Sequence, residues 1–170
     1  MLAPLPAAHN ENFRETMSCF ATGVCVVSID EPEKVGVTIN SLVSVSLEPL
    51  LILFCLGKDT KTHEHFLKSA QQKGQWGISM LAQAQEDIST RFTHWNPDLW
   101  DQTPLLPQSG APLLAGGAAY LKGEFDSTFN GGDHTIFLCR VTQCLAIPEM
   151  SPLIYTQRHY RALAPSAHSI

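Results

Sequence analysis

Two long runs of strand-forming residues, 118–129 and 134–146, are separated in this chain by only four residues. Those four are Asn130, Gly131, Gly132 and Asp133, residue types that supply the positive φ angles of a tight hairpin turn. The sequence therefore predicts a long antiparallel β-hairpin in the C-terminal half of the chain.

Other strand-forming runs accompany this hairpin. Apolar, largely β-branched segments predict strands at residues 24–29, 35–41, 50–56 and 76–81, and a further segment at 153–156 is expected to close the sheet. Most of these strands are neighbours in the sequence and are separated by turns. The pattern favours a mainly β fold, an antiparallel barrel, over a doubly wound α/β sheet.

Helices are expected to be few and short. Asn10 is expected to cap an N-terminal helix that ends at Gly23 and carries on one face Phe13, Met17 and Phe20. Residues 60–68 and 84–92 predict two more helices at the ends of the barrel. The segment 94–117 is rich in Pro, Trp and Gly and predicts a long loop.

Length and composition indicate one globular domain. No repeat, low-complexity tract or linker divides the 170 residues, so we expect a single domain, 1–170, with a core at about 12–160. The net charge is −5, and no run of Lys and Arg occurs. Because phosphate backbones require clustered positive charge, a nucleic-acid partner is not expected.

The sequence contains no recognisable export or membrane segment. Residues 1–6 lack the basic start and apolar stretch of a signal peptide, and the longest apolar run, 50–56, is too short to cross a bilayer. The five cysteines form no CxxC pair, and Cys25, Cys55 and Cys139 lie in predicted strands. Free cysteines in such positions pack as small apolar residues, which is typical of proteins in a reducing compartment. We therefore expect a cytoplasmic protein with no membrane partner.

The most unusual polar segment lies at residues 38–46, because no GxGxxG, GxxxxGK[ST] or GxSxG motif is present. Five polar side chains there alternate with apolar ones: Thr38, Asn40, Ser41, Ser44 and Ser46. A row of hydroxyls with one amide and strand-edge amides suits a flat heteroaromatic ligand with many acceptors. The alternative is that these residues face solvent or form ST-turns.

Residues 57–62 form a second candidate. Lys58, Thr60 and Thr62 stand where a buried strand leads into a short helix. A lysine, two hydroxyls and the free amides of a helix N-terminus make an anion site suited to a phosphate, although Asp59 places a like charge beside it. The alternative is an ordinary capped helix with a solvated lysine.

The third candidate is the pair Asp133 and His134 at the hairpin, which indicates an acid–base pair, a metal ligand or a hydrogen-bonded turn. Neighbours on a strand point to opposite faces, so a direct contact between the two side chains is not expected. His63 and His65, two apart on a predicted helix, do not share a face. No metal site is predicted.

Several short segments occur in an order that resembles one known family. They are FR at 13–14, FATGV at 20–24, GVTINS at 36–41, SVSLEP at 44–49 and GDHT at 132–135. Together they resemble the flavin reductase-like family, the short-chain reductase components of two-component flavin monooxygenases. The resemblance runs from Asn12 to Tyr160. It departs from the family at Leu50, where a second proline often follows Pro49, and it gives no role to the loop at 93–117.

The resemblance implies an FMN-binding split β-barrel of Greek-key type, usually a homodimer, with FMN or FAD near the subunit interface. Members oxidise NADH or NADPH and release reduced flavin to a partner oxygenase. By position, the isoalloxazine and ribityl cradle would comprise Thr38, Asn40, Ser41, Ser44, Val45 and Ser46. The phosphate side would comprise Cys55, Leu56, Lys58, Thr60 and Thr62. His134 would lie near the nicotinamide.

Two other functions stay open at this point. One is a non-catalytic flavin-binding or electron-transfer protein on the same fold, because a fold does not determine a function. The other is a split-barrel module for haem or pyridoxal phosphate, for which the sequence marks neither an axial ligand nor a Schiff-base lysine. A flavin reductase needs no catalytic triad, because the cofactors carry the chemistry.

Overall fold

Strands dominate the computed structural model, which describes residues 5–94 and 96–163. Residues 1–4, 95 and 164–170 lie outside the described residues. They include part of the segment in which no signal peptide is recognised and one residue of the predicted loop. The helical elements are α1 (Asn10–Ser18), α2 (Lys61–Gln71), α3 (Glu86–Arg91) and the 3₁₀ turn η1 (Pro97–Leu99). The strands are β1 (Thr22–Gly23), β2 (Cys25–Ile29), β3 (Val35–Ile39), β4 (Val43–Leu47), β5 (Leu50–Gly57), β6 (Gln75–Met80), β7 (Ala119–Gly131), β8 (His134–Ala146), β9 (Ile154–Thr156) and β10 (His159–Arg161).

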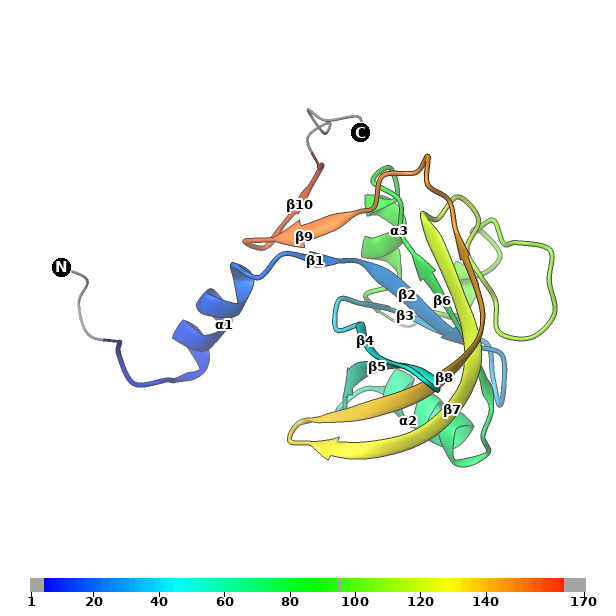
Figure 1. The fold of residues 1–170 in the computed structure, drawn as a ribbon, viewed down its shortest axis with the longest axis horizontal. Coiled ribbons are helices and arrows are strands. Elements are labelled where there is room, and N and C mark those ends of the chain that lie inside the picture. Colours follow the sequence, from blue (N-terminus) through cyan, green and yellow to red (C-terminus); the bar gives the residue numbers. More distant parts are fainter. Residues whose placement is uncertain (1–4, 95, 164–170) are drawn as a thin grey trace.

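The long hairpin β7–β8 lies at the centre of a seven-stranded antiparallel sheet with the order β3-β2-β6-β7-β8-β5-β4 (Figure 1). Its last pair joins Gly131 to His134, and Gly132 in the turn has a φ of +76°. The predicted hairpin is therefore confirmed, but its turn is shorter than predicted, because Asn130 and Gly131 still pair in β7 and only Gly132 and Asp133 form the turn. The register shifts twice along the pair, once between Lys122 and Gly123 and once between Phe125 and Ser127.

The two edge strands of this sheet, β3 and β4, are consecutive in the chain. Only residues 40–42 join them, and so short a connection spans at most about 15 Å. The first and last strands of a seven-stranded sheet can be joined in this way only if the sheet curls back on itself. The two edges approach without a backbone ladder between them, so the barrel stays open along one seam. This is the predicted split β-barrel with a few short flanking helices.

Strand β2 is buried on both faces. Cys25, Val27 and Ile29 face the larger apolar cluster inside the barrel, together with Phe54 and Phe137. Val26 of β2 faces a second cluster beneath α3, whose other members include Phe92 and Trp100. Burial raises the pKa of the Cys25 thiol to about 12 and that of Cys139 further still, so both thiols pack as neutral apolar groups.

The segment 38–46 does not form one continuous row of hydroxyls, which corrects the sequence-based expectation. Thr38 belongs to β3, residues 40–42 cross the seam, and Ser44 and Ser46 belong to β4. A β-bulge between Ser44 and Ser46 shifts the alternation a second time, because Val45 is the extra residue. The polar spacing of the sequence therefore reflects two breaks in the backbone that a periodicity of two does not reveal.

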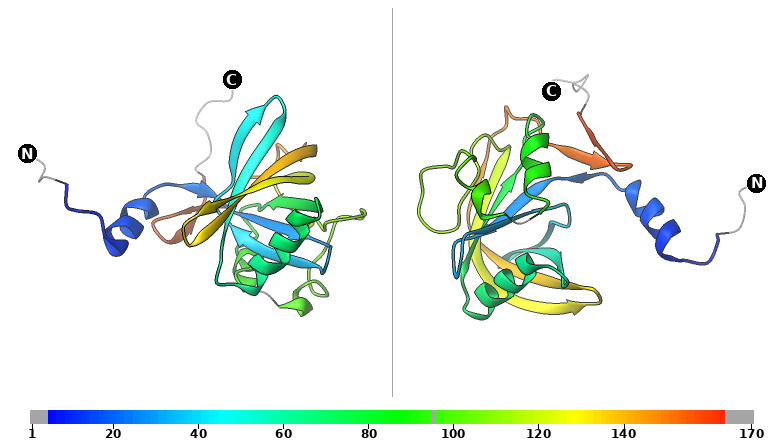
Figure 2. Two further views of the ribbon diagram at one scale, coloured as in Figure 1. Left: turned by 90° about the horizontal axis from the view of Figure 1, so that it is seen from below. Right: turned by 180° about the vertical axis from the view of Figure 1, so that it is seen from behind.

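The N-terminal helix and the last predicted strand also differ from expectation. The N-cap of α1 is His9 rather than Asn10, the helix ends at Ser18, and Gly23 belongs to β1. The strand predicted at 153–156 does not close the main sheet, because β9 pairs with β1 and β10 in a separate three-stranded sheet. Figures 1 and 2 show α1 projecting from the barrel, and none of its residues is buried.

Candidate functional site

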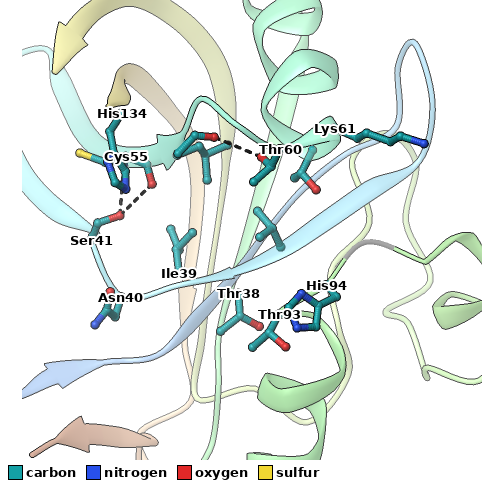
Figure 3. Close-up of a pocket in the computed structure, with 14 residues that line it drawn as sticks. Thr38, Ile39, Asn40, Ser41, Cys55, Thr60, Lys61, Thr93, His94 and His134 are labelled. Atoms are coloured by element: carbon teal, nitrogen blue, oxygen red, sulfur yellow. Dashed lines mark hydrogen bonds between the residues drawn. The ribbon is translucent and has the colours of Figure 1, made fainter. Parts of the chain in front are cut away.

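A cavity of about 530 Å³ opens at the seam of the barrel (Figure 3). Its walls come from β3, the end of β5, the first turn of α2, the start of β8 and the residues after α3. The lining residues are Val37, Thr38, Ile39, Asn40, Ser41, Cys55, Leu56, Gly57, Thr60, Lys61, Thr62, Thr93, His94 and His134. Eight of the twelve residues predicted from the sequence are among them.

Ser41 fastens one end of the cavity. Its hydroxyl accepts a hydrogen bond from the Cys55 N–H at 3.0 Å and donates to the Cys55 carbonyl at 3.2 Å. Ser41 thus extends the β4–β5 pairing with a side chain, because Val43 pairs with Leu53 two residues further along each strand. Cys55 is half-buried, and burial raises the pKa of its thiol, so it forms a neutral part of the wall.

Asp133 and His134 contact each other directly beside this end of the cavity. The Oδ1 atom of Asp133 lies 2.8 Å from Nδ1 of His134. The expectation that neighbouring residues cannot pair is wrong here because β8 begins at His134, and Asp133 still belongs to the turn. The hydrogen bond and the charge of His134 hold the pKa of the Asp133 carboxyl below its usual range, so it stays ionised at neutral pH.

The other end of the cavity lies at the N-terminus of α2. Thr60 is the N-cap, and its hydroxyl accepts from the His63 N–H at 3.1 Å and donates to the Gly57 carbonyl at 3.1 Å. The N–H groups of Lys61 and Thr62 precede the first intrahelical hydrogen bond, so they point toward the open end of the helix. The positive end of the helix dipole and the Lys61 side chain together favour an anion. Lys61 was not predicted as a site residue.

Thr38 connects the β3 wall to α3. Its N–H donates to the Phe92 carbonyl at 2.9 Å, and its hydroxyl donates to the Ser89 carbonyl at 2.7 Å. These bonds bring the residues after α3, Thr93 and His94, to the cavity opposite Lys61 (Figure 3). The sequence carries no motif for these two residues, and the helix that precedes them is the one signal of their position.

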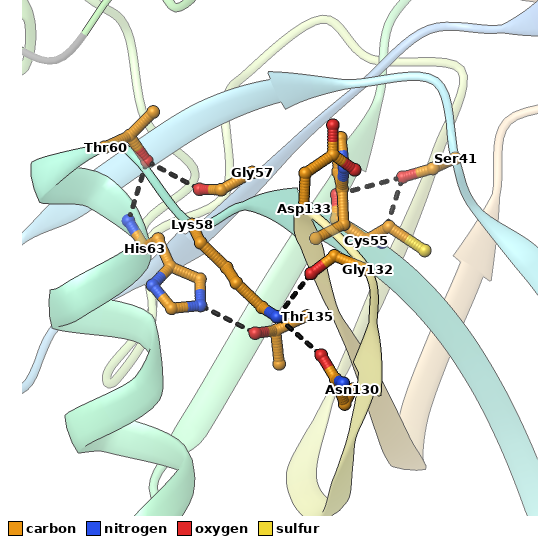
Figure 4. A network of polar contacts seen from close by, with 11 residues as sticks. Ser41, Cys55, Gly57, Lys58, Thr60, His63, Asn130, Gly132, Asp133 and Thr135 are labelled. Atoms are coloured by element: carbon orange, nitrogen blue, oxygen red, sulfur yellow. Dashed lines mark hydrogen bonds and ion pairs between the residues drawn. The ribbon is translucent and has the colours of Figure 1, made fainter.

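Four predicted residues do not line this cavity. Ser46 accepts from the Glu48 N–H at 3.2 Å, which is the ST-turn named as the alternative. Val45 is 47 % exposed on β4, and Ser44 lines a neighbouring groove. The Lys58 ammonium donates to Asn130 Oδ1 and to the Gly132 carbonyl, both at 2.5 Å (Figure 4). The lysine is engaged by the hairpin turn because it leaves β5 directly opposite that turn.

A wider groove of about 1,570 Å³ adjoins the cavity. One side of it is formed by α1 and the other by β4, with β1 and the turn before β10 between them. It shares four lining residues with the cavity: Asn40, Ser41, Cys55 and His134. The two spaces therefore meet at these residues, and a ligand in one would lie beside a ligand in the other.

The chemistry of the cavity fits a flavin nucleotide. Its volume falls within the range of about 300–1,000 Å³ that is typical of small-molecule sites. Apolar side chains of Val37 and Ile39 can pack against a ring system, and the helix N-terminus with Lys61 suits the phosphate. No group of three or more potential metal ligands occurs among the described residues. None of the helices in the described part of the chain is long and apolar enough to span a bilayer.

Comparison with known sequences places this site in context. Residues 17–164 match the family profile described as the flavin reductase like domain. An NADH-dependent FAD reductase of Streptomyces globisporus is 35 % identical over 160 residues, which cover 91 % of this chain and 86 % of the relative. The reductase subunit of a flavin-dependent monooxygenase of Rhodococcus jostii is 32 % identical over 159 residues, 90 % of this chain and 77 % of the relative.

Solved structures agree with these matches. The Streptomyces globisporus NADH:FAD oxidoreductase, in complex with NAD and FAD fragments, superimposes with a TM-score of 0.84 at 34 % identity. The alignment covers 92 % of this chain and 93 % of that one. The flavin reductase component of a bacterial two-component tryptophan halogenase superimposes with a TM-score of 0.79 at 29 % identity, over 91 % and 98 % of the two chains.

Proposed function

The chain belongs to the flavin reductase-like family, and we propose that it is an NAD(P)H-dependent flavin reductase that reduces FMN or FAD and supplies the product to a partner monooxygenase. This proposal rests on one observation: the cavity at the seam and the wider groove beside it meet at Asn40, Ser41, Cys55 and His134. Hydride transfer requires the reacting atoms to approach within about 3–3.5 Å. A flavin ring reaching the junction from the cavity can meet a nicotinamide that enters from the groove.

The residues of the chain bind and orient rather than react. The bound cofactors supply the chemistry, a hydride transfer from nicotinamide C4 to flavin N5 with a proton taken from water. The wall formed by Ser41 and Cys55 supports the ring end of the cavity, and α2 with Lys61 holds the phosphate end. His134 orients the nicotinamide from the side of the groove.

Lys61 is expected to recognise the flavin phosphate. Lys61→Ala should weaken FMN binding roughly tenfold, because a hydrogen bond to a charged group contributes about 1.5–3 kcal/mol. Riboflavin, which has no phosphate, should bind to wild type and variant with Kd values within about twofold of each other. Fluorescence titration of both flavins measures this difference, and equal losses for FMN and riboflavin would place Lys61 outside the phosphate site.

His134 is expected to act on the nicotinamide. In His134→Ala the KM for NADH should rise roughly tenfold, because one hydrogen bond to the nucleotide is lost. The Kd for FMN should change by less than about twofold, since the cavity wall on the β3 and β5 side is intact. Steady-state kinetics with a flavin titration tests this prediction, and an unchanged KM for both NADH and NADPH rejects the role.

We also propose that the protein forms a homodimer. The exposed helix α1 carries Phe13 and Met17, which are 59 % and 48 % exposed. Phe20, two residues after the helix, is 67 % exposed, and Leu47 on β4 is 84 % exposed. A nine-residue helix has little stability without a packed face. Exposed apolar residues that gather along one groove are typical of a protein–protein interface. A second copy of the chain that covers this groove would enclose the junction of the two spaces.

If the dimer interface encloses the flavin site, a substitution that disrupts the dimer should also weaken flavin binding. Sedimentation equilibrium of the wild type should give the mass of a dimer. A variant with Phe13→Asp and Met17→Asp should sediment as a monomer, because two carboxylates cannot be buried unpaired. A wild-type monomer at micromolar concentration contradicts the dimer.

The decisive measurement for the function is oxidation of NADH and NADPH with FMN, FAD or riboflavin supplied in turn. Sustained turnover that requires added flavin supports the reductase. Flavin binding without turnover would indicate the non-catalytic flavoprotein instead, and the absence of flavin binding at micromolar protein rejects both functions.

We also propose that the protein is cytoplasmic and forms a single domain. We place the protein in the cytoplasm because all five cysteines are free thiols, as expected in a reducing compartment. We take residues 1–170 as one domain because the two apolar clusters lie on opposite faces of the same strand, β2.

A further inference from the structure

Lys58 makes three hydrogen bonds to the turn of the long hairpin (Figure 4). Its N–H donates to the Asp133 carbonyl at 3.0 Å. Its ammonium donates to Asn130 Oδ1 and to the Gly132 carbonyl. One residue that follows β5 therefore holds Asn130 near the end of β7 and both residues of the β7–β8 turn, Gly132 and Asp133.

The turn determines where His134 points. Asp133 hydrogen-bonds Nδ1 of the His134 ring, and the Asp133 side chain is 89 % exposed, so packing does not hold the carboxylate in place. Its position follows from the backbone of the turn. When a carboxylate occupies Nδ1 of a histidine, the ring orientation is set and Nε2 is presented to the other side. Nε2 of His134 faces β5, 3.8 Å from the Cβ position of Gly57 in the cavity wall.

A buried contact supports the same end of the hairpin from below. Nε2 of His63 on α2 lies 2.8 Å from the hydroxyl of Thr135, the residue after His134. Burial, with a contribution from the charge of Lys58, lowers the pKa of His63, so its ring packs as a neutral group. The start of β8 is thus held by a buried contact, whereas the turn before it is held by the contacts of Lys58.

On the basis of the function proposed above, we propose that Lys58 is a positioning residue for the reductase reaction. It holds the end of β7 and the Gly132–Asp133 turn so that Asp133 orients the His134 imidazole toward the nicotinamide. Lys58 acts through His134 and does not contact the flavin phosphate. The juxtaposition of Lys58 with Asn130, Gly132 and Asp133 carries this inference.

Kinetics of Lys58→Met provide the first test, because methionine keeps most of the aliphatic chain and removes the ammonium. We expect the KM for NADH to rise roughly fivefold while kcat at saturating NADH and the Kd for FMN and riboflavin stay within about twofold. Lys58→Arg, which can still donate to both acceptors, should restore most of the loss. The matched control is Lys122→Met. In the wild type the Lys122 ammonium donates to the Ser109 carbonyl at 2.6 Å, away from the site, so this variant should behave as wild type.

A double variant separates positioning from other causes. If Lys58 acts through His134, Lys58→Met should add nothing to the KM of a His134→Ala enzyme. Multiplicative effects of the two substitutions would overturn the proposal. A loss of FMN binding that riboflavin does not share would also overturn it, because Lys58 would then bind the phosphate.

The histidine ring can be observed without any turnover. In ¹H–¹⁵N spectra of the imidazoles, the His134 signals are assigned by their disappearance in His134→Ala. Lys58→Met should shift or broaden these signals and leave those of His159 unchanged. Unaltered His134 signals overturn the proposal whatever the kinetics show. A shifted ring in a protein that fails to oxidise NADH would instead reject the reductase function and leave the positioning intact.

Discussion

Alanine at Gly123 is expected to destabilise the protein by about 3 kcal/mol or more, the largest effect on stability that we predict for a single methyl group. Gly123 lies at the register shift between β7 and β8. A Cβ atom there would lie 1.8 Å from the Arg140 carbonyl oxygen and 2.7 Å from Cζ2 of Trp76. The backbone oxygen belongs to the ladder and the Trp76 ring is fully buried, so neither can move away cheaply.

Thermal and urea unfolding measure this effect. For a chain of this length, a loss of 3 kcal/mol should lower Tm by roughly 6–12 °C. The matched control is Gly23→Ala on β1, where the added methyl group meets no atom within 4 Å and Tm should stay nearly constant. An unchanged Tm in Gly123→Ala would mean that the bulge accommodates a Cβ atom without loss of stability. The register shift would then not require glycine at position 123.

The long hairpin, the mainly β class and most strands could be predicted from the sequence because each depends on local patterns. Gly132 and Asp133 supply the turn, and the flanking β-branched residues supply the strands. The seam could not be predicted in this way. It depends on β3 and β4 lying at opposite edges of one sheet, which is a property of the whole topology.

The candidate site was recognised by its segments more reliably than by its individual residues. Cys55 and Thr60 line the cavity because they stand at the end of β5 and the start of α2, where the sequence placed them. The choice between Lys58 and Lys61 could not be made from spacing. Lys58 leaves a strand opposite the hairpin turn and bonds to it, whereas Lys61, three residues later, occupies the first helical turn.

The pair of Asp133 and His134 shows a different limit. The rule that neighbours point to opposite faces holds only within a strand, and β8 begins at His134. A shift of one residue in the predicted start of the strand would have reversed the conclusion. The exact start of β8 depends on long-range contacts such as the hydrogen bonds from Lys58 to the hairpin. These bonds join residues more than seventy apart in the sequence.

Valine at Gly57 should abolish flavin binding while it preserves the fold, and this is the largest functional effect that we expect. Gly57 ends β5 on the same face as Cys55, and it lines the cavity directly. A Cβ atom there meets only Nε2 of His134 within 4 Å, so the fold has room for a larger side chain, and that side chain would occupy part of the cavity that Gly57 lines. Because β-branched residues favour strands, the substitution should not weaken β5. The Kd for FMN should rise about a hundredfold, equivalent to about 2.7 kcal/mol.

Gly57→Ala is the matched control, because its single methyl group makes an ordinary contact at 3.8 Å and takes up less of the cavity than valine does. FMN should bind to it within about threefold of the wild-type Kd, with an unchanged Tm. The comparison depends on size alone, since both variants remove the same glycine and retain the carbonyl that accepts from Thr60. If Gly57→Val folds normally and still binds FMN at the wild-type Kd, the flavin does not occupy the seam of the barrel, and the roles assigned to Ser41 and Lys61 fail with it.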